Sequence, residues 1–147
     1  MSESVNMKEL AKLTGTVIEN HRIDYAIGMG NINAIFMATD IGEKRKVVLK
    51  RPLESDSLMV FPKIARTYQK LGHDCKNNEA LLRVIKGGGI EYLVMEYIEG
   101  PTLADEIKRT GGYSIDKSLK VISDVLIGLI HASERGVRPP GNRIGRC

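Results

Sequence analysis

Tryptophan is absent from this chain, and aromatic residues make up only 5% of its 147 residues. Cysteine is nearly absent too: Cys75 and Cys147 are too few for a disulfide framework, which favours reduced thiols in a cytoplasmic protein. No apolar run reaches the roughly 18 residues that a membrane span needs, and residues 1–7 lack the apolar core of a signal peptide. The sequence therefore argues against a secreted disulfide-rich domain and against a membrane protein.

A large charge excess is also missing. The net charge is +4, with 42% hydrophobic and 27% charged residues, which excludes disorder as the main state and allows one domain with its own core. The positive charge is spread along the chain rather than gathered in a patch. The arginines at 138, 143 and 146 could contact phosphates, but a solvated tail is the favoured interpretation, so we do not expect a nucleic-acid partner.

Turn-forming segments separate five apolar stretches that we expect to be β-strands. These strands cover residues 16–27, 34–39, 46–50, 80–86 and 90–97, with Gly87-Gly88-Gly89 as a hairpin signal between the last two. Between the third and fourth strands, a set of apolar residues at helical spacing predicts a helix of about ten residues that begins at Pro62 and stops at Gly72. The set is Phe61, Ile64, Tyr68 and Leu71.

Three further helices are expected from their capping residues. Asn6 opens a short helix over residues 7–13, Thr102 opens a helix that ends before Gly111, and Ser114 opens the longest helix, over residues 115–135. Together the elements predict an α+β fold: a five-stranded antiparallel sheet with one helix against it, followed by two C-terminal helices.

Two local features could carry chemistry. Gly28-x-Gly30 lies between two strands, where backbone N–H groups can approach a phosphate, although taken alone it is a hairpin turn. Lys50 ends an apolar strand and, taken alone, is a solvated lysine at the margin of a sheet. The histidines at 21, 73 and 131 have no ligand spacing with the cysteines, so no metal site is predicted.

From Gly15 to Val137 the chain resembles the N-terminal lobe of a eukaryotic-like serine/threonine protein kinase of the bacterial type. The glycine loop of that family, G-x-G-x-x-G-x-V-x-x-A, matches Gly28, Gly30, Asn33, Ile35 and Ala38, and its V-A-x-K strand matches the segment that ends in Lys50. Its hinge segment, L-V-M-E-Y-x-x-G, is intact over residues 93–100. The resemblance predicts the kinase N-lobe fold.

The resemblance also implies a site for ATP. Lys50 would contact the α- and β-phosphates, apolar side chains would form a wall of the adenine slot with Met95 at its back, and backbone groups of the hinge would bind the adenine edge. The implied nucleotide-binding residues are Ile27, Gly28, Gly30, Ile35, Val48, Lys50, Met95, Glu96, Tyr97 and Ile98.

The departures from the family weaken this expectation. Asn33 replaces the third loop glycine; asparagine tolerates a positive φ better than most residues, so the turn can survive, but close approach of a phosphate is not expected there. Val48 replaces the usual alanine and narrows the adenine slot. Ile64 stands where the family has the glutamate that pairs with the strand lysine, and Glu79 fits that role only in a different register. After Val137 the chain reads Arg-Pro-Pro instead of His-Arg-Asp, and no Mg²⁺-binding motif follows.

We therefore expect a truncated or degenerate kinase-like protein, a pseudokinase without catalytic residues or bound Mg²⁺, with weak ATP binding. Two alternatives stay open: a divergent serine/threonine kinase, including one completed by a partner chain, and a protein-docking module built on a kinase lobe. The expected organisation is an N-terminal extension at 1–14, the lobe at 15–98, the hinge and first helices of the second lobe at 99–136, and an irregular basic tail at 137–147.

The last predicted helix carries an apolar stripe. Its members, at helical spacing, are Leu119, Ile122, Leu126, Leu129 and Ile130. In the family this helix is packed inside the C-terminal lobe. We therefore expect a homodimer, or a partner protein, that covers helix 115–135; the alternative is that the helix folds back on its own lobe.

Overall fold

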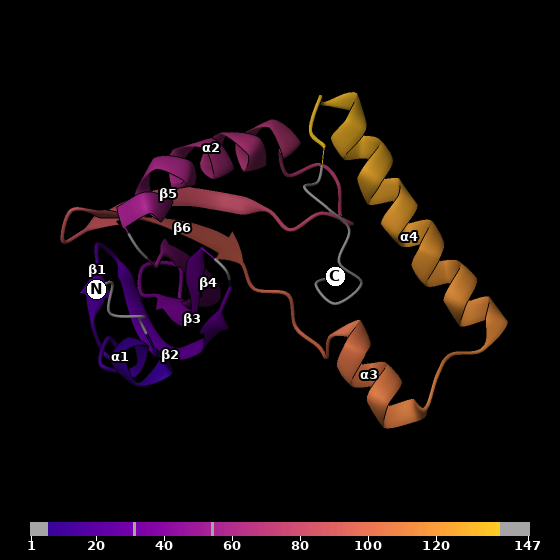
Figure 1. Cartoon of the computed structure of the whole chain (residues 1–147), viewed down its shortest axis with the longest axis horizontal. Helices are drawn as coiled ribbons and strands as arrows, with labels where there is room; N and C mark the ends of the chain where they lie inside the picture. The colour runs from indigo at the N-terminus through magenta and orange to yellow at the C-terminus, as the bar shows by residue number, and fades with distance from the viewer. Residues whose placement is uncertain (1–5, 31, 54, 139–147) are drawn as a thin grey trace. The chain divides into compact units, whose positions relative to one another are not determined.

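The computed structural model describes residues 6–30, 32–53 and 55–138 (Figure 1). Within these ranges it has four helices and six strands, which confirms the predicted α+β class. The elements are α1 (Met7–Ala11), β1 (Val17–Ile18), β2 (His21–Met29), β3 (Asn33–Asp40), β4 (Arg45–Pro52), α2 (Ser55–Leu71), β5 (Leu81–Gly87), β6 (Ile90–Glu96), α3 (Leu103–Thr110) and α4 (Ile115–Glu134).

The described residues fall into two compact units. One lies within Met1–Gln69 and Ala80–Tyr97, and the other within Lys70–Glu79 and Ile98–Cys147. The first unit contains the sheet, and the second contains α3 and α4. The domain boundaries expected from the sequence stay predictions. The segment expected as an N-terminal extension contributes α1, whose Leu10 is buried in the core of the first unit.

All six described strands pair antiparallel in the order β1-β2-β3-β4-β6-β5. The strand count differs from the five expected because the segment 16–27 forms two strands rather than one. Glu19 takes a left-handed backbone conformation with φ of 51°, so the chain reverses at Glu19-Asn20 and β1 pairs with β2. The Glu19 carboxylate then accepts a hydrogen bond from the Lys86 amide at 2.9 Å, which ties this turn to β5 at the other end of the sheet order.

One core lies on the face of the sheet that carries α1. Alternation along the strands places Phe36 of β3, Leu49 of β4 and Val94 of β6 on this face, all fully buried. Leu10 of α1 and Ile18 of β1 complete the cluster. Gly87 packs so closely on Ile18 that a side-chain carbon at position 87 would lie 2.7 Å from a methyl group of Ile18. The sheet is therefore curled around a filled interior.

A second core lies between the other sheet face and α2, which runs along β5 and β6 in Figure 1. Phe61 and Ala65 of α2 bury against Leu93 and Met95 of β6. The predicted start of this helix is wrong: α2 begins at Ser55, and Pro62 lies inside it. A proline within a helix costs one backbone hydrogen bond, but burial of Phe61 next to it offsets that loss, so the helix continues through the proline.

The remaining turns and caps follow the sequence signals. Gly88 and Gly89 both have positive φ, 59° and 78°, and form the two-residue hairpin predicted between the last two strands. The predicted helix caps are confirmed by hydrogen bonds from backbone amides to Asn6, Thr102 and Ser114. Among the described helices, none is both long and apolar enough to cross a membrane. From residue 139 on, the predicted irregular tail lies outside the described residues.

Candidate nucleotide site

The register of three strand pairs gathers most of the predicted site on one face of the sheet. Gly28 of β2 pairs with Ile35 of β3, and Ile35 pairs with Lys50 of β4. In the next row, Met37 pairs with Val48, and Val48 pairs with Met95 of β6. Because paired residues point to the same side of a sheet, these residues share one surface. It is the face that α2 covers further along, over β5 and β6.

The side chains of the apolar wall expected at this site differ in how far they are exposed to solvent. Ile35 and Val48 are half-buried, and Ile27 is exposed. Ile27 has no strand partner because a β-bulge between Ala26 and Gly28 inserts it as an extra residue. Met95 is fully buried against α2 and supports this face from within the second core. The face is therefore exposed to solvent at β2 and becomes buried at β6, where α2 packs against it.

The glycine turn is closed by its own backbone. Gly30 donates its amide hydrogen to the Asn33 carbonyl oxygen at 2.7 Å. The Asn33 side-chain oxygen lies 2.4 Å from where a side-chain carbon of residue 30 would be, so the amide covers the glycine. Asn33 is the first residue of β3 and does not use the positive φ that the sequence argument invoked for it. Gly28 lies within β2, so the turn is shorter than expected.

Lys50 lies beside an aromatic ring of α2. Its ammonium nitrogen is 5.5 Å from the centre of the Tyr68 ring, within the range of a cation–π contact. Ile64, one helical turn earlier, packs into the second core, as expected for the residue at the position of the family's glutamate. Sequence reasoning placed Ile64 and Tyr68 on the same side of the helix, four residues apart, but did not predict that Tyr68 lies beside Lys50.

The segment after β6 contributes backbone and side-chain anchors. The carboxylate of Glu96 accepts a hydrogen bond from the Ala80 amide at 2.8 Å, and the Glu96 amide donates to the Ala80 carbonyl at 3.0 Å. Tyr97 has the Lys46 ammonium 5.6 Å from its ring centre. Ile98 is exposed and is the first residue of the second unit in this part of the chain. The Glu96 side chain therefore holds Ala80, the residue that precedes β5, through a hydrogen bond.

A buried charged cluster at the other end of β3 was not anticipated from the sequence. His21 and Asp40 are cross-strand partners, each 1% exposed, with 3.4 Å between Nε2 and Oδ2. Arg83 also lies 3.4 Å from Asp40 Oδ2, and the other carboxylate oxygen accepts the amides of Gly42 and Glu43. The Glu43 amide, followed by the charges of His21 and Arg83, holds the pKa of Asp40 below its usual range despite burial.

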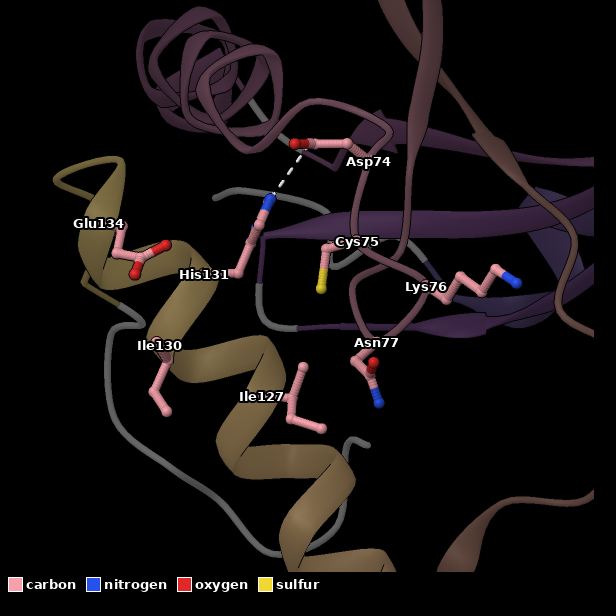
Figure 2. Close-up of a pocket in the computed structure, with 8 residues that line it drawn as sticks. All are labelled: Asp74, Cys75, Lys76, Asn77, Ile127, Ile130, His131 and Glu134. Carbon is pink, nitrogen blue, oxygen red and sulfur yellow. Dashed lines mark hydrogen bonds and ion pairs between the residues drawn. The ribbon is translucent and has the colours of Figure 1, made fainter.

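The second unit has an open hollow of about 490 Å³ between the segment 74–77 and the last turns of α4 (Figure 2). At its edge, His131 Nε2 lies 3.1 Å from Asp74 Oδ1, and the other ring nitrogen lies 3.1 Å from Asn78 Nδ2. Hydrogen bonds from its own backbone amide and from His131 lower the pKa of Asp74. Cys75 also lines the hollow. Both nitrogens of His131 are therefore committed to neighbours, and neither is left to activate the thiol.

A curled antiparallel sheet with α2 across one face defines a protein-kinase N-lobe-like fold, as the sequence predicted. Sequence similarity to known proteins supports the same class. A probable serine/threonine-protein kinase of Clostridium acetobutylicum is 29% identical over 130 residues, which cover 85% of this chain and 20% of that kinase. PknA of Corynebacterium glutamicum is 28% identical over 137 residues, covering 85% of this chain and 29% of PknA. PrkC of Bacillus subtilis is 25% identical over 122 residues, which cover 80% of this chain and 18% of PrkC.

The predicted resemblance is thereby confirmed: the chain is kinase-like and related to bacterial serine/threonine protein kinases. No family model matches it. The chain spans between 18% and 29% of the length of these three relatives.

Proposed function

We propose that the chain is a kinase-like protein that binds ATP weakly and does not itself transfer phosphate. The observation that supports the proposal most is the row of paired residues Gly28, Ile35 and Lys50, with Val48 beside it on the same sheet face. A glycine turn offers backbone amides to a phosphate, and a nearby lysine offers a positive charge. The apolar side chains next to them suit the flat face of a purine.

The backbone of residues 96–98 is proposed to recognise the adenine edge. This segment follows β6 directly, and its sequence keeps the hinge pattern of protein kinases. Glu96 takes part through its carbonyl group, because its carboxylate is already hydrogen-bonded to the Ala80 amide. Backbone recognition tolerates changes of side chain, so this part of the site depends little on the identity of Tyr97 and Ile98.

Two residues next to the proposed site, Asn33 and Val48, explain why we expect ATP to bind weakly. The Gly30 amide is already bonded to the Asn33 carbonyl, and the Asn33 side chain covers Gly30, so the turn has fewer donors for a phosphate. Val48 also takes up more of the apolar slot than alanine would. We expect a Kd no lower than about 0.1 mM, which corresponds to roughly −5.5 kcal/mol.

The proposed lack of phosphotransfer has a separate basis in the sequence. Phosphoryl transfer needs metal ions that neutralise charge and a carboxylate that orients the acceptor hydroxyl. Where the kinase catalytic loop carries His-Arg-Asp, this chain carries Arg138-Pro139-Pro140. The catalytic aspartate of that loop is therefore replaced in this segment, and the chain is proposed to be a pseudokinase that does not use a catalytic aspartate.

ATP binding is tested by nuclear magnetic resonance titration of the 147-residue chain, with and without Mg²⁺. We expect shifts of resonances from β2, β3 and β4 that saturate only at millimolar ATP. Lys50→Met should weaken binding by about fivefold or more, and Val48→Ala should strengthen it by about threefold. Lys63→Met is the matched control, because Lys63 is an exposed lysine of α2, and it should change nothing.

Two results would contradict the proposal. Micromolar binding that requires Mg²⁺ would point to an intact kinase site, and no binding at several millimolar ATP would favour the docking-module interpretation. Phosphotransfer is measured separately, with labelled ATP, Mn²⁺ or Mg²⁺ and a generic protein substrate. Incorporation above background that Lys50→Met abolishes and Lys63→Met preserves would identify a divergent kinase instead.

A further inference from the structure

The outer face of α4 carries five large apolar side chains that stay in solvent. They are Ile115, Leu119, Ile122, Leu126 and Ile130, between 50% and 79% exposed. Their spacing of four, three, four and four residues keeps them on one side of the helix, and we call this set the α4 stripe. The first three steps match the 3.5-residue repeat with which two helices pack knobs into holes.

The packing of α4 within its own unit fixes the direction of the stripe. Gly128 and Ala132 are buried on the opposite side of the helix. The Gly128 carbonyl accepts a hydrogen bond from Asn78 Nδ2 at 3.2 Å, and a side-chain carbon at position 128 would lie 3.0 Å from the Asn77 carbonyl oxygen. Arg135 adds an ion pair to Asp74, and His131 adds a hydrogen bond to the same carboxylate. These contacts prevent α4 from rotating about its axis to bury the stripe.

Two lysines of α4 that lie away from the stripe are paired within the chain. Lys120 bonds Asp124 one turn later at 3.2 Å, and Lys117 bonds Glu106 of α3. Ser118, Ser123 and Val125 flank the middle of the stripe and carry no charge, whereas the exposed carboxylates of Asp116 and Glu134 lie beside its two ends. The middle of the stripe, from Leu119 to Leu126, therefore has no charged neighbour on the helix, and two identical stripes can meet there without repulsion between like charges.

We propose that the α4 stripe is the contact surface of a symmetric homodimer, in which α4 packs against α4 of a second copy. The exposed parts of the five side chains amount to roughly 550 Å² per chain, or about 1,100 Å² for two copies. That area just exceeds the lower limit for a specific interface, so the dimer dissociates on dilution. The proposal is independent of the nucleotide site.

The test measures the mass of the 147-residue chain in reductant by light scattering after size exclusion, at protein concentrations from about 2 to 200 μM. The chain mass is 16.3 kDa, and we expect a shift from that value to twice that value as concentration rises. Leu126→Glu places a charge at the middle of the stripe and should leave a monomer throughout. Ile115→Glu should weaken dimerisation while favouring the helix, because an acidic residue suits a helix N-terminus.

Met59→Glu is the matched control. Met59 of α2 is another exposed apolar side chain, as exposed as Ile115, and lies outside the stripe. This variant should dimerise like the original chain, and far-UV circular dichroism should be unchanged in all three variants. A monomer at every concentration would overturn the proposal. So would a dimer that survives Leu126→Glu, or polydisperse aggregation that neither stripe variant reduces.

Discussion

Replacement of Asp40 by asparagine should destabilise the protein strongly, although the change removes no carbon atom. Asparagine keeps an oxygen for the Gly42 and Glu43 amides. In place of Oδ2, however, it presents an NH₂ group to His21 and Arg83, both 3.4 Å from that oxygen in the original chain. Donors then face donors at a site where His21 is only 1% exposed.

The magnitude follows from the burial of each partner. Removing one member of a buried ion pair costs about 3–5 kcal/mol because the other is left without compensation. Arg83 is partly exposed and can be rehydrated, and the backbone hydrogen bonds survive, so we expect a smaller loss than that, about 2–3 kcal/mol. With a urea dependence of about 2 kcal/mol per molar, the unfolding midpoint should fall by about 1–1.5 M. The chain has no tryptophan, so circular dichroism follows the transition.

The effect of Asp40→Asn should depend on pH. The pKa of Asp40 is lower in the folded chain than its ordinary value of 3.8, so the folded state binds fewer protons at this group than the unfolded state does. Its contribution to the free energy of unfolding is therefore complete above pH 3.8 and is lost as pH falls through the folded pKa. The difference between the original chain and the variant should shrink as pH falls below 4.

Glu43→Gln is the matched control for this measurement. Glu43 also bonds Arg83, at 2.8 Å, but its side chain is half-exposed, so the expected loss is below about 1 kcal/mol. If Asp40→Asn changed the midpoint no more than Glu43→Gln does, the buried cluster would not stabilise the fold. A difference that stays constant down to pH 3 would contradict the role assigned to the Asp40 charge.

Three further substitutions test the packing of individual elements, each by urea unfolding. Gly87→Ala should cost about 1–3 kcal/mol, because the new methyl group would lie 2.7 Å from Ile18; a neutral effect would mean that β1 does not close against β5. Phe61→Ala should cost about 3–5 kcal/mol by opening a cavity under α2, and a loss below 1 kcal/mol would refute the second core. Thr102→Ala should cost about 1 kcal/mol by removing the hydrogen bond to the Asp105 amide, whereas Thr102→Ser should restore it.

Local sequence signals predicted most element boundaries, and the two errors have physical causes. The helix caps and the Gly88-Gly89 hairpin were identified because they depend on residues close in sequence. The reversal at Glu19-Asn20 was missed because neither residue is a glycine, and the hydrogen bond from Lys86 that supports it comes from a distant strand. A strand of two residues is too short to show alternation.

The start of α2 illustrates how tertiary packing overrides a local rule. Proline is favoured in the first turn of a helix, and this preference placed the start at Pro62. The helix begins seven residues earlier because Phe61 and Ala65, on either side of the proline, bury against β6. That burial involves residues about thirty positions away, which no local pattern contains. The helical spacing of Phe61, Ile64 and Tyr68 was nevertheless correct as a description of the buried side.

The sequence predicted which residues form the candidate site, but it did not predict the contacts that their side chains make. A family pattern fixes which residues stand at which positions, and strand alternation then determines which of them share a face. The covering of Gly30 by Asn33, and the position of Tyr68 beside Lys50, depend on side-chain conformations and on the placement of α2. These two contacts involve residues that replace the family pattern or lie outside the quoted motifs, so the pattern carried no information on them.

Alternation along β4 separates the residues that build the fold from those that define the candidate site. Val47 and Leu49 are fully buried in the core around α1, whereas Val48 and Lys50 point to the opposite face. Selection for the core around α1 therefore acts on Val47 and Leu49, whereas Val48 packs against the second core, so a change at position 48 affects that core instead. A chain that no longer needed tight nucleotide binding could exchange alanine for valine at position 48 and keep its fold. The departures at positions 33, 48 and 64 coexist with an intact core because none of them faces the cluster of Leu49 and Phe36.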